Sequence, residues 1–172
     1  MTSGTRMVTY SALAVGLVTV STMLLRIPIP QTKGYINIGD AAVMAIAMLL
    51  GPKIGGIGGG LGSALADILS GYPHWAPFTL VIKGLEGLIV GLFASKQTRF
   101  FSRLLILILA GVEMVGGYFL AERFLYGFGA AVVELPGNLF QSGSSIAISL
   151  AFYYAVQRSF PALTGGTGKM SW

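Results

Sequence analysis

The sequence predicts an all-α integral membrane protein with six transmembrane helices. The 172 residues are 54% hydrophobic and only 10% charged, whereas about a quarter of the residues in an ordinary soluble domain are charged. The apolar residues gather into runs of the length needed to cross a hydrocarbon core of about 30 Å. Short segments rich in proline, glycine or basic residues separate these runs, as expected for loops between helices.

The first helix is expected over residues 7–25, where the chain is apolar apart from threonine and serine. This run is longer than the apolar core of about 7 to 15 residues that is typical of a signal peptide. Residues 27–39 contain two prolines and two glycines, so this segment is predicted to be a loop. Asp40 is expected to cap a short helix over residues 41–50.

Four further helices are expected in the remainder of the chain. Their ranges are residues 54–70, 78–94, 104–125 and 132–156. The segments between them are a break at 51–53, a loop at 71–77, a basic connector with Lys96, Arg99 and Arg103, and a turn at 127–130. The chain is thus predicted to form one six-helix transmembrane domain over residues 1–158. Residues 159–172, rich in glycine, serine and threonine, are expected to form a mobile cytosolic tail.

The distribution of basic residues predicts the orientation in the membrane. Six spans place both termini on one side, which would carry Arg6, Lys53, Lys96, Arg99, Arg103, Arg158 and Lys169. The opposite side would carry only Arg26, Lys33 and Arg123. Because lysine and arginine are concentrated in cytoplasmic loops, both termini are expected in the cytosol of a cell-membrane protein. The net charge of +5 therefore reflects topology and predicts no nucleic-acid partner.

The chain carries no sign of an enzyme or a metal site. It contains no cysteine, which excludes disulfides, thiolate metal ligands and a cysteine nucleophile. It also lacks a Ser-His-Asp set, an H-E-x-x-H motif and a paired acidic metal motif. The glycine-rich stretch does not match a phosphate-binding loop. Its glycines at positions 51, 55, 59 and 62 recur at helical spacing, which favours close helix packing in lipid.

Ionisable residues inside membrane spans are costly unless they are paired or face a wet cavity, so each is a functional candidate. Ser63, Asp67 and Ser70 share one face of the third helix, and Thr79, Lys83 and Glu86 share one face of the fourth. Two interpretations of Lys83 stay open at this point. It pairs with Glu86 or Asp67 and locks the bundle, or it contacts a ligand.

The last two helices carry further polar residues. Glu113 lies near mid-depth of the fifth helix, and Tyr118 and Glu122 follow toward the outside. The sixth helix carries one polar stripe, formed by Glu134, Asn138, Gln141 and Ser145. A carboxylate and two amides offer both donors and acceptors, which suits a flat heterocycle better than an inorganic ion. The alternatives are a protonated, buried Glu113 and interhelical hydrogen bonding by the stripe.

Aromatic and polar residues in the outer loops complete the candidate site. Trp75 and Tyr72 either stack on a ligand or anchor the loop at the membrane interface. Tyr35 and Asn37 in the first outer loop are candidate lid contacts.

Three segments together resemble a known family. They are GYINIGD at residues 34–40, LLGPKIGGIGGGLGSALADILSGY at 49–72 and WAPFTLVIKGLEG at 75–87. They are similar to the substrate-binding S-components of energy-coupling factor (ECF) vitamin transporters, in the branch with riboflavin-type and hydroxymethylpyrimidine-type members. The resemblance implies an S-component-like bundle that captures a vitamin or its precursor from outside. It also implies a transmembrane T-component and two cytosolic ATP-binding subunits as partners, and no cofactor in this chain.

The resemblance also implies where the ligand and the T-component bind. Ligand sites of the family lie in the outer half, which in this chain contains Tyr35, Asn37, Trp75, Lys83, Glu86, Glu113, Tyr118, Glu134, Asn138 and Gln141. The family docks on the T-component through small residues of the first helix, matched here by Ala12 and Gly16, although alanine is more usual at the second position.

Among the vitamins, hydroxymethylpyrimidine, the thiamine precursor, is favoured, followed by pyridoxine or pyridoxamine and then riboflavin. The competing class is a structural or assembly subunit whose polar residues only hold helices together.

Overall fold

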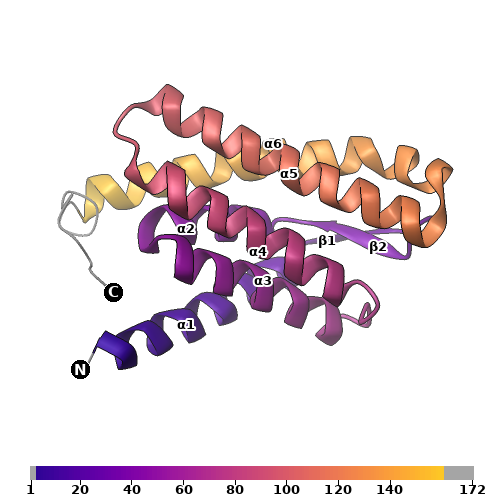
Figure 1. The fold of residues 1–172 in the computed structure, drawn as a ribbon, viewed down its shortest axis with the longest axis horizontal. Coiled ribbons are helices and arrows are strands. Elements are labelled where there is room, and N and C mark those ends of the chain that lie inside the picture. The colour runs from indigo at the N-terminus through magenta and orange to yellow at the C-terminus, as the bar shows by residue number, and fades with distance from the viewer. Residues whose placement is uncertain (1–2, 161–172) are drawn as a thin grey trace.

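The computed structural model describes residues 3–160 and shows a mostly helical fold with one β-hairpin (Figure 1). The elements in chain order are α1 (Ser3–Leu24), β1 (Arg26–Ile29), β2 (Gly34–Asn37), α2 (Gly39–Leu50), α3 (Pro52–Leu69), α4 (Ala76–Phe93), a 3₁₀ turn η1 (Ala94–Lys96), α5 (Phe100–Tyr126) and α6 (Phe128–Ser159). The six predicted helices are confirmed. The predicted tail begins at a residue that still belongs to α6, and residues 161–172 lie outside the described part.

The prediction of an all-α chain is wrong for the segment between α1 and α2. There β1 and β2 pair antiparallel, with Arg26 opposite Asn37 and Ile29 opposite Gly34. Pro28 and Pro30 suggested a loop because proline cannot donate a ladder hydrogen bond. In a two-stranded hairpin each strand is an edge, so Pro28 in β1 is tolerated where its missing N–H costs no pairing.

Helix α5 begins four residues earlier than predicted and includes Arg103, which was assigned to a basic connector. Arg103 is only 3% exposed, and its guanidinium donates to the carbonyl oxygens of Ala94 and Gln97 and to the Tyr154 hydroxyl, 2.7 Å away. These carbonyls follow the end of α4, where a helix lacks partners for its last C=O groups. The arginine is therefore buried because it satisfies that helix end.

The predicted turn at residues 127–130 shrinks to Gly127 alone, because α6 begins at Phe128. Gly127 has φ 90°. It is the single residue between the end of α5 and the start of α6. Only glycine adopts this left-handed conformation without a steric penalty. One residue is thus enough to reverse the chain, and α6 begins four residues, about one turn, earlier than predicted.

The predicted close packing is confirmed for Gly55, Gly59 and Gly62 of α3, but not for Gly51, which precedes the helix and where a Cβ would meet nothing within 4 Å. A Cβ atom on Gly59 would lie 2.5 Å from the Lys83 carbonyl oxygen of α4, and one on Gly58 would lie 2.8 Å from the Ala14 side chain of α1. Both distances are shorter than real Cβ contacts. Helix α3 therefore lies between α1 and α4 (Figure 1), at a separation that only glycine permits.

Large apolar side chains cover the outside of the bundle, among them Leu17, Leu61, Leu92, Val112 and Phe140. Within the described residues, four helices are long and apolar enough to cross a membrane by length and composition, namely α1, α4, α5 and α6. The twelve-residue α2 is shorter and contacts α1, α3, α4 and α6, with Val43, Met44 and Ala47 fully buried. The bundle thus has an apolar exterior and a central short helix.

The two ends of the bundle differ in content. The start of α1 and the end of α6 lie at one end, together with the α2–α3 and α4–α5 connections (Figure 1). The hairpin and the α3–α4 and α5–α6 turns lie at the opposite end. This arrangement follows from an even number of helices that alternate in direction. It gathers the three segments predicted to face outward around one site.

Candidate substrate site

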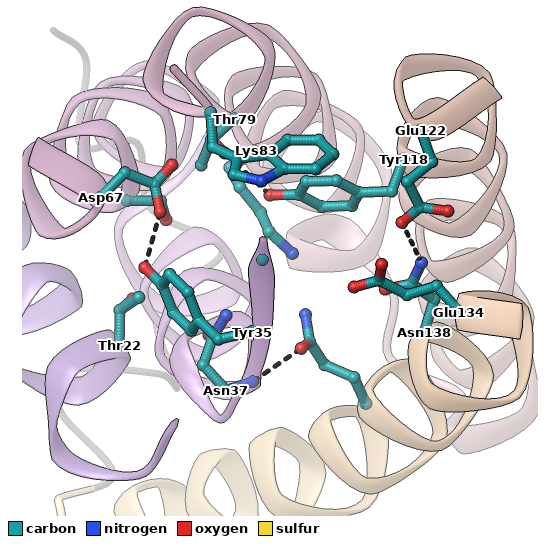
Figure 2. Close-up of a pocket in the computed structure, with 14 residues that line it drawn as sticks. Thr22, Tyr35, Asn37, Asp67, Thr79, Lys83, Tyr118, Glu122, Glu134 and Asn138 are labelled. Atoms are coloured by element: carbon teal, nitrogen blue, oxygen red, sulfur yellow. Dashed lines mark hydrogen bonds between the residues drawn. The ribbon is translucent and has the colours of Figure 1, made fainter. Parts of the chain in front are cut away.

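A polar pocket lies beneath the hairpin, where five helices converge (Figure 2). Its lining residues are Thr22, Gly34, Tyr35, Asn37, Ser63, Asp67, Trp75, Thr79, Lys83, Tyr118, Glu122, Glu134, Asn138 and Gln141. The cavity volume is about 30 Å³, and one water molecule needs roughly 10 to 15 Å³ of such volume. A heterocyclic ring therefore enters this pocket only when side chains or the hairpin move.

Most residues that the sequence predicted for the site line this pocket, but Glu86 and Glu113 do not. Glu86 is completely buried beside Lys83, and Glu113 is half-buried on α5. The lining residues outside the predicted set are Thr22, Gly34, Ser63, Asp67, Thr79 and Glu122. The polar faces of α3 and α4 indicate Ser63, Asp67 and Thr79, whereas Thr22 is one of several threonines and serines scattered along α1 and gives no signal.

The hairpin is tied to the helices by its aromatic neighbours. The Tyr35 hydroxyl donates to Asp67 Oδ1 at 2.6 Å (Figure 2). Burial and the Asp67 carboxylate both raise the pKa of Tyr35, so the phenol stays protonated as a donor. Trp75 is 4% exposed, and its indole N–H donates to the carbonyl oxygens of Thr32 and Lys33. Trp75 therefore holds the hairpin turn while its ring lines the pocket.

A buried charged centre lies at the floor of the pocket. Lys83 is 1% exposed, and its ammonium group forms ion pairs with Asp40 and with Glu86 Oε2, the latter at 3.4 Å. Of the two predicted partners, Glu86 is confirmed and Asp67 is wrong, because Asp67 accepts from Tyr35 instead. The ammonium also lies 5.2 Å from the Tyr118 ring centroid, within the range of a cation–π interaction.

Asp40 does not cap α2, contrary to the prediction. The helix begins at Gly39, and no side-chain bond forms at its capping position. The Asn37 side-chain oxygen instead accepts the Gly39 N–H at 2.8 Å, which satisfies one of the free donors at a helix start. The Asp40 carboxylate points inward to Lys83 and Gln141. Its role as a charge partner was hidden by its position just before an apolar run.

Carboxylates and an amide gather where α5 and α6 face each other (Figure 2). Asn138 Nδ2 donates to Glu122 Oε1 at 2.8 Å. Oε2 of Glu122 and Oε2 of Glu134 are buried and have no hydrogen-bond partner among the described residues. A buried acceptor without a partner carries a desolvation penalty. This part of the pocket is therefore suited to a ligand that presents N–H or O–H groups.

The comparison with known proteins identifies the family. The S component of ECF-type riboflavin transporters matches residues 3–158. The chain belongs to this family of ECF S components. It is 50% identical over 141 residues to an uncharacterized protein of Pyrococcus woesei, covering 82% of this chain and 95% of that protein. It is 33% identical over 119 residues to the thiamine precursor transporter HmpT of Lactococcus lactis, covering 69% and 68% of the two chains.

Membership of this family settles the class of function. The protein is a multi-pass membrane subunit of a transporter and not an enzyme. ECF S components bind the substrate without a cofactor, and they pair with a T component and with ATPases that use the ATP. The buried polar residues therefore belong to a substrate-binding subunit, which excludes the structural or assembly subunit weighed from the sequence.

Proposed function

We propose that this S component captures hydroxymethylpyrimidine, the thiamine precursor, in the pocket beneath the hairpin. The relative at 33% identity that is named a thiamine precursor transporter supports this substrate. The observation that carries the proposal is the pair of partnerless carboxylate oxygens on Glu122 and Glu134. Hydroxymethylpyrimidine has an amino group beside a ring nitrogen and a hydroxymethyl group, so it supplies N–H and O–H donors for these acceptors.

The opposite wall suits the rest of such a ring. Lys83 and Gln141 supply donors that can reach a ring nitrogen or a hydroxyl oxygen. The rings of Tyr35, Trp75 and Tyr118 supply aromatic surface, against which a heterocycle stacks favourably. Each polar edge of an aminopyrimidine then meets a complementary group.

Pyridoxine, pyridoxamine and riboflavin are the alternative substrates. Riboflavin gives its name to the matched family. Its three fused rings and ribityl chain require far more space than a single ring, and the closed pocket offers only about 30 Å³. To admit any ring, the pocket must open, which breaks or shifts contacts such as the hydrogen bond from Tyr35 to Asp67. The smallest ligand requires the least displacement of the hairpin and side chains.

We further propose the orientation and the partner surface. The excess of basic residues at the end with the chain termini supports a cytosolic location for that end, with the pocket at the end that faces outside. Ala12 and Gly16 are both exposed on α1, and a Cβ on Gly16 would meet nothing within 4 Å. This small, uncovered surface supports docking of the T-component on α1.

A thermal-shift screen of the purified chain in detergent tests the substrate. Hydroxymethylpyrimidine, thiamine, pyridoxine, pyridoxamine and riboflavin are added separately. A ligand at about 100 times its dissociation constant stabilises the folded state by roughly 2.7 kcal/mol. We expect hydroxymethylpyrimidine to give the largest shift. A larger shift with another of these compounds would identify that compound, and not hydroxymethylpyrimidine, as the substrate. No shift with any of them would refute the proposal.

Two matched variants test the position of the site. Glu134→Gln removes an acceptor that lines the pocket, and a charged hydrogen bond contributes roughly 1.5 to 3 kcal/mol, so affinity should fall by about ten-fold or more. Glu113→Gln makes the same chemical change on a carboxyl that does not line the pocket, and it should leave affinity within about two-fold. The reverse pattern would place the ligand near Glu113.

A further inference from the structure

Asp40 lies directly behind the pocket without lining it. It is completely buried near the start of α2. One carboxylate oxygen pairs with Lys83 on α4, and the other accepts from Gln141 Nε2 on α6 at 3.0 Å. Both of these partners line the pocket. Asp40 on α2 therefore orients two side chains that line the pocket, Lys83 on α4 and Gln141 on α6.

The bonds around Gln141 fix which way its amide points. A carboxylate paired with an ammonium group is ionised and can only accept hydrogen bonds, so the Gln141 NH₂ group must face Asp40. The Gln141 oxygen then faces the backbone N–H of Asn37 in β2, from which it accepts at 2.7 Å. An amide NH₂ carries two hydrogens. Gln141 therefore retains one N–H for a ligand, and its oxygen is already engaged by the hairpin.

We propose that Asp40 is a positioning residue that determines the hydrogen-bonding specificity of the site. By turning Gln141, and by holding Lys83, it makes this wall of the pocket a donor surface. Glu122 and Glu134 make the α5–α6 wall an acceptor surface. This inference rests on the proposed function, and it specifies the substrate class further. The ligand is a heteroaromatic ring with a hydrogen-bond acceptor on one edge and donors on the other.

Exchanging the two side chains tests this assignment. In the double variant Asp40→Asn with Gln141→Glu, the new amide can donate to the new carboxylate, which can still accept from Asn37 N–H. Net charge and side-chain volume are retained, and Lys83 can bond the new amide oxygen and still pair with Glu86. The network therefore closes again, but position 141 now offers only acceptors to the ligand.

The readout is affinity for two kinds of ligand. The first is the best-binding heterocycle of the wild-type screen, and the second is a set of its analogues in which one ring nitrogen at a time is replaced by C–H. We expect the exchanged variant to melt close to the wild type and to bind the parent ligand about ten-fold more weakly. We also expect the wild type to favour the parent over one analogue, and the exchanged variant to lose that preference.

Each outcome decides the inference. If the exchanged variant binds the parent ligand as tightly as the wild type and keeps the same preference, Asp40 only holds helices together and the inference is wrong. If the exchanged variant does not fold, the single change Asp40→Asn is measured in its place. A neutral amide no longer requires the Gln141 NH₂ group to face it, so only the bond from Asn37 N–H still holds the Gln141 orientation and the preference should be reduced. An unchanged preference in that variant would also overturn the inference. If the wild type binds none of the heterocycles, the proposed function itself is refuted, and the inference about Asp40 falls with it.

Discussion

Lys83→Met should be among the most damaging substitutions in this protein. Methionine is apolar and similar in length, so the packing of α4 is retained while the charge is lost. The change leaves Asp40 and Glu86, both completely buried, without their shared cation. Removing one partner of a buried ion pair costs roughly 3 to 5 kcal/mol, mainly because the other charge stays buried without compensation. We expect a loss of that size in ligand-free protein.

A second substitution separates charge from packing. Adding Asp40→Asn to Lys83→Met removes one of the two uncompensated carboxylates and leaves Glu86, so part of the lost stability should return, as a double-mutant cycle would show. Asp67→Asn is the matched single control. The Tyr35 hydroxyl, now 2.6 Å from the carboxylate oxygen, can still donate to an amide oxygen, and the cost should stay below about 1.5 kcal/mol.

The assay is unfolding of purified protein in mild detergent, followed as the fraction folded against temperature or added denaturing detergent. The wild type, Lys83→Met, Asp40→Asn, the double variant of these two positions and the Asp67→Asn control are compared without ligand. A Lys83→Met protein within about 1 kcal/mol of the wild type would refute the reasoning. So would a double variant that is less stable than Lys83→Met, because the lost charge would then not be the cause.

Three further predictions concern packing, docking and pH. Gly59→Ala should lower the melting temperature, since its Cβ would lie 2.5 Å from the Lys83 carbonyl oxygen and overpacking costs roughly 1 to 3 kcal/mol. Gly16 is exposed and a Cβ there meets nothing within 4 Å, so Gly16→Leu should leave melting and ligand binding unchanged but abolish uptake with the partner subunits. Unimpaired uptake would refute docking at this position. Burial and Asp67 raise the pKa of Tyr35 above its ordinary value of 10.0. Stability should therefore fall as pH rises above about 10, where the unfolded phenol ionises first. Tyr35→Phe should reduce that fall, and identical pH profiles would contradict the shift.

The sequence was sufficient for the class of fold and for much of the site. Apolar runs predicted the six helices, four of which are long enough to cross a membrane, because a backbone in lipid must satisfy its own hydrogen bonds and so forms helices. The spacing of Glu134, Asn138 and Gln141 predicted one polar face of α6, and all three line the pocket. A costly polar group inside a span is visible in the sequence alone, since its position in an apolar run is the signal.

The sequence could not decide which polar groups meet. Asp40 stands where a cap is common, and only the approach of α4 and α6 makes it the partner of Lys83 and Gln141. Arg103 resembles a loop cation, but it becomes buried because it satisfies carbonyls at the end of α4. Helical spacing fixes which residues share a face, but which faces meet depends on packing between segments far apart in the chain. Those long-range contacts, and not any local pattern, select each buried charge's partner.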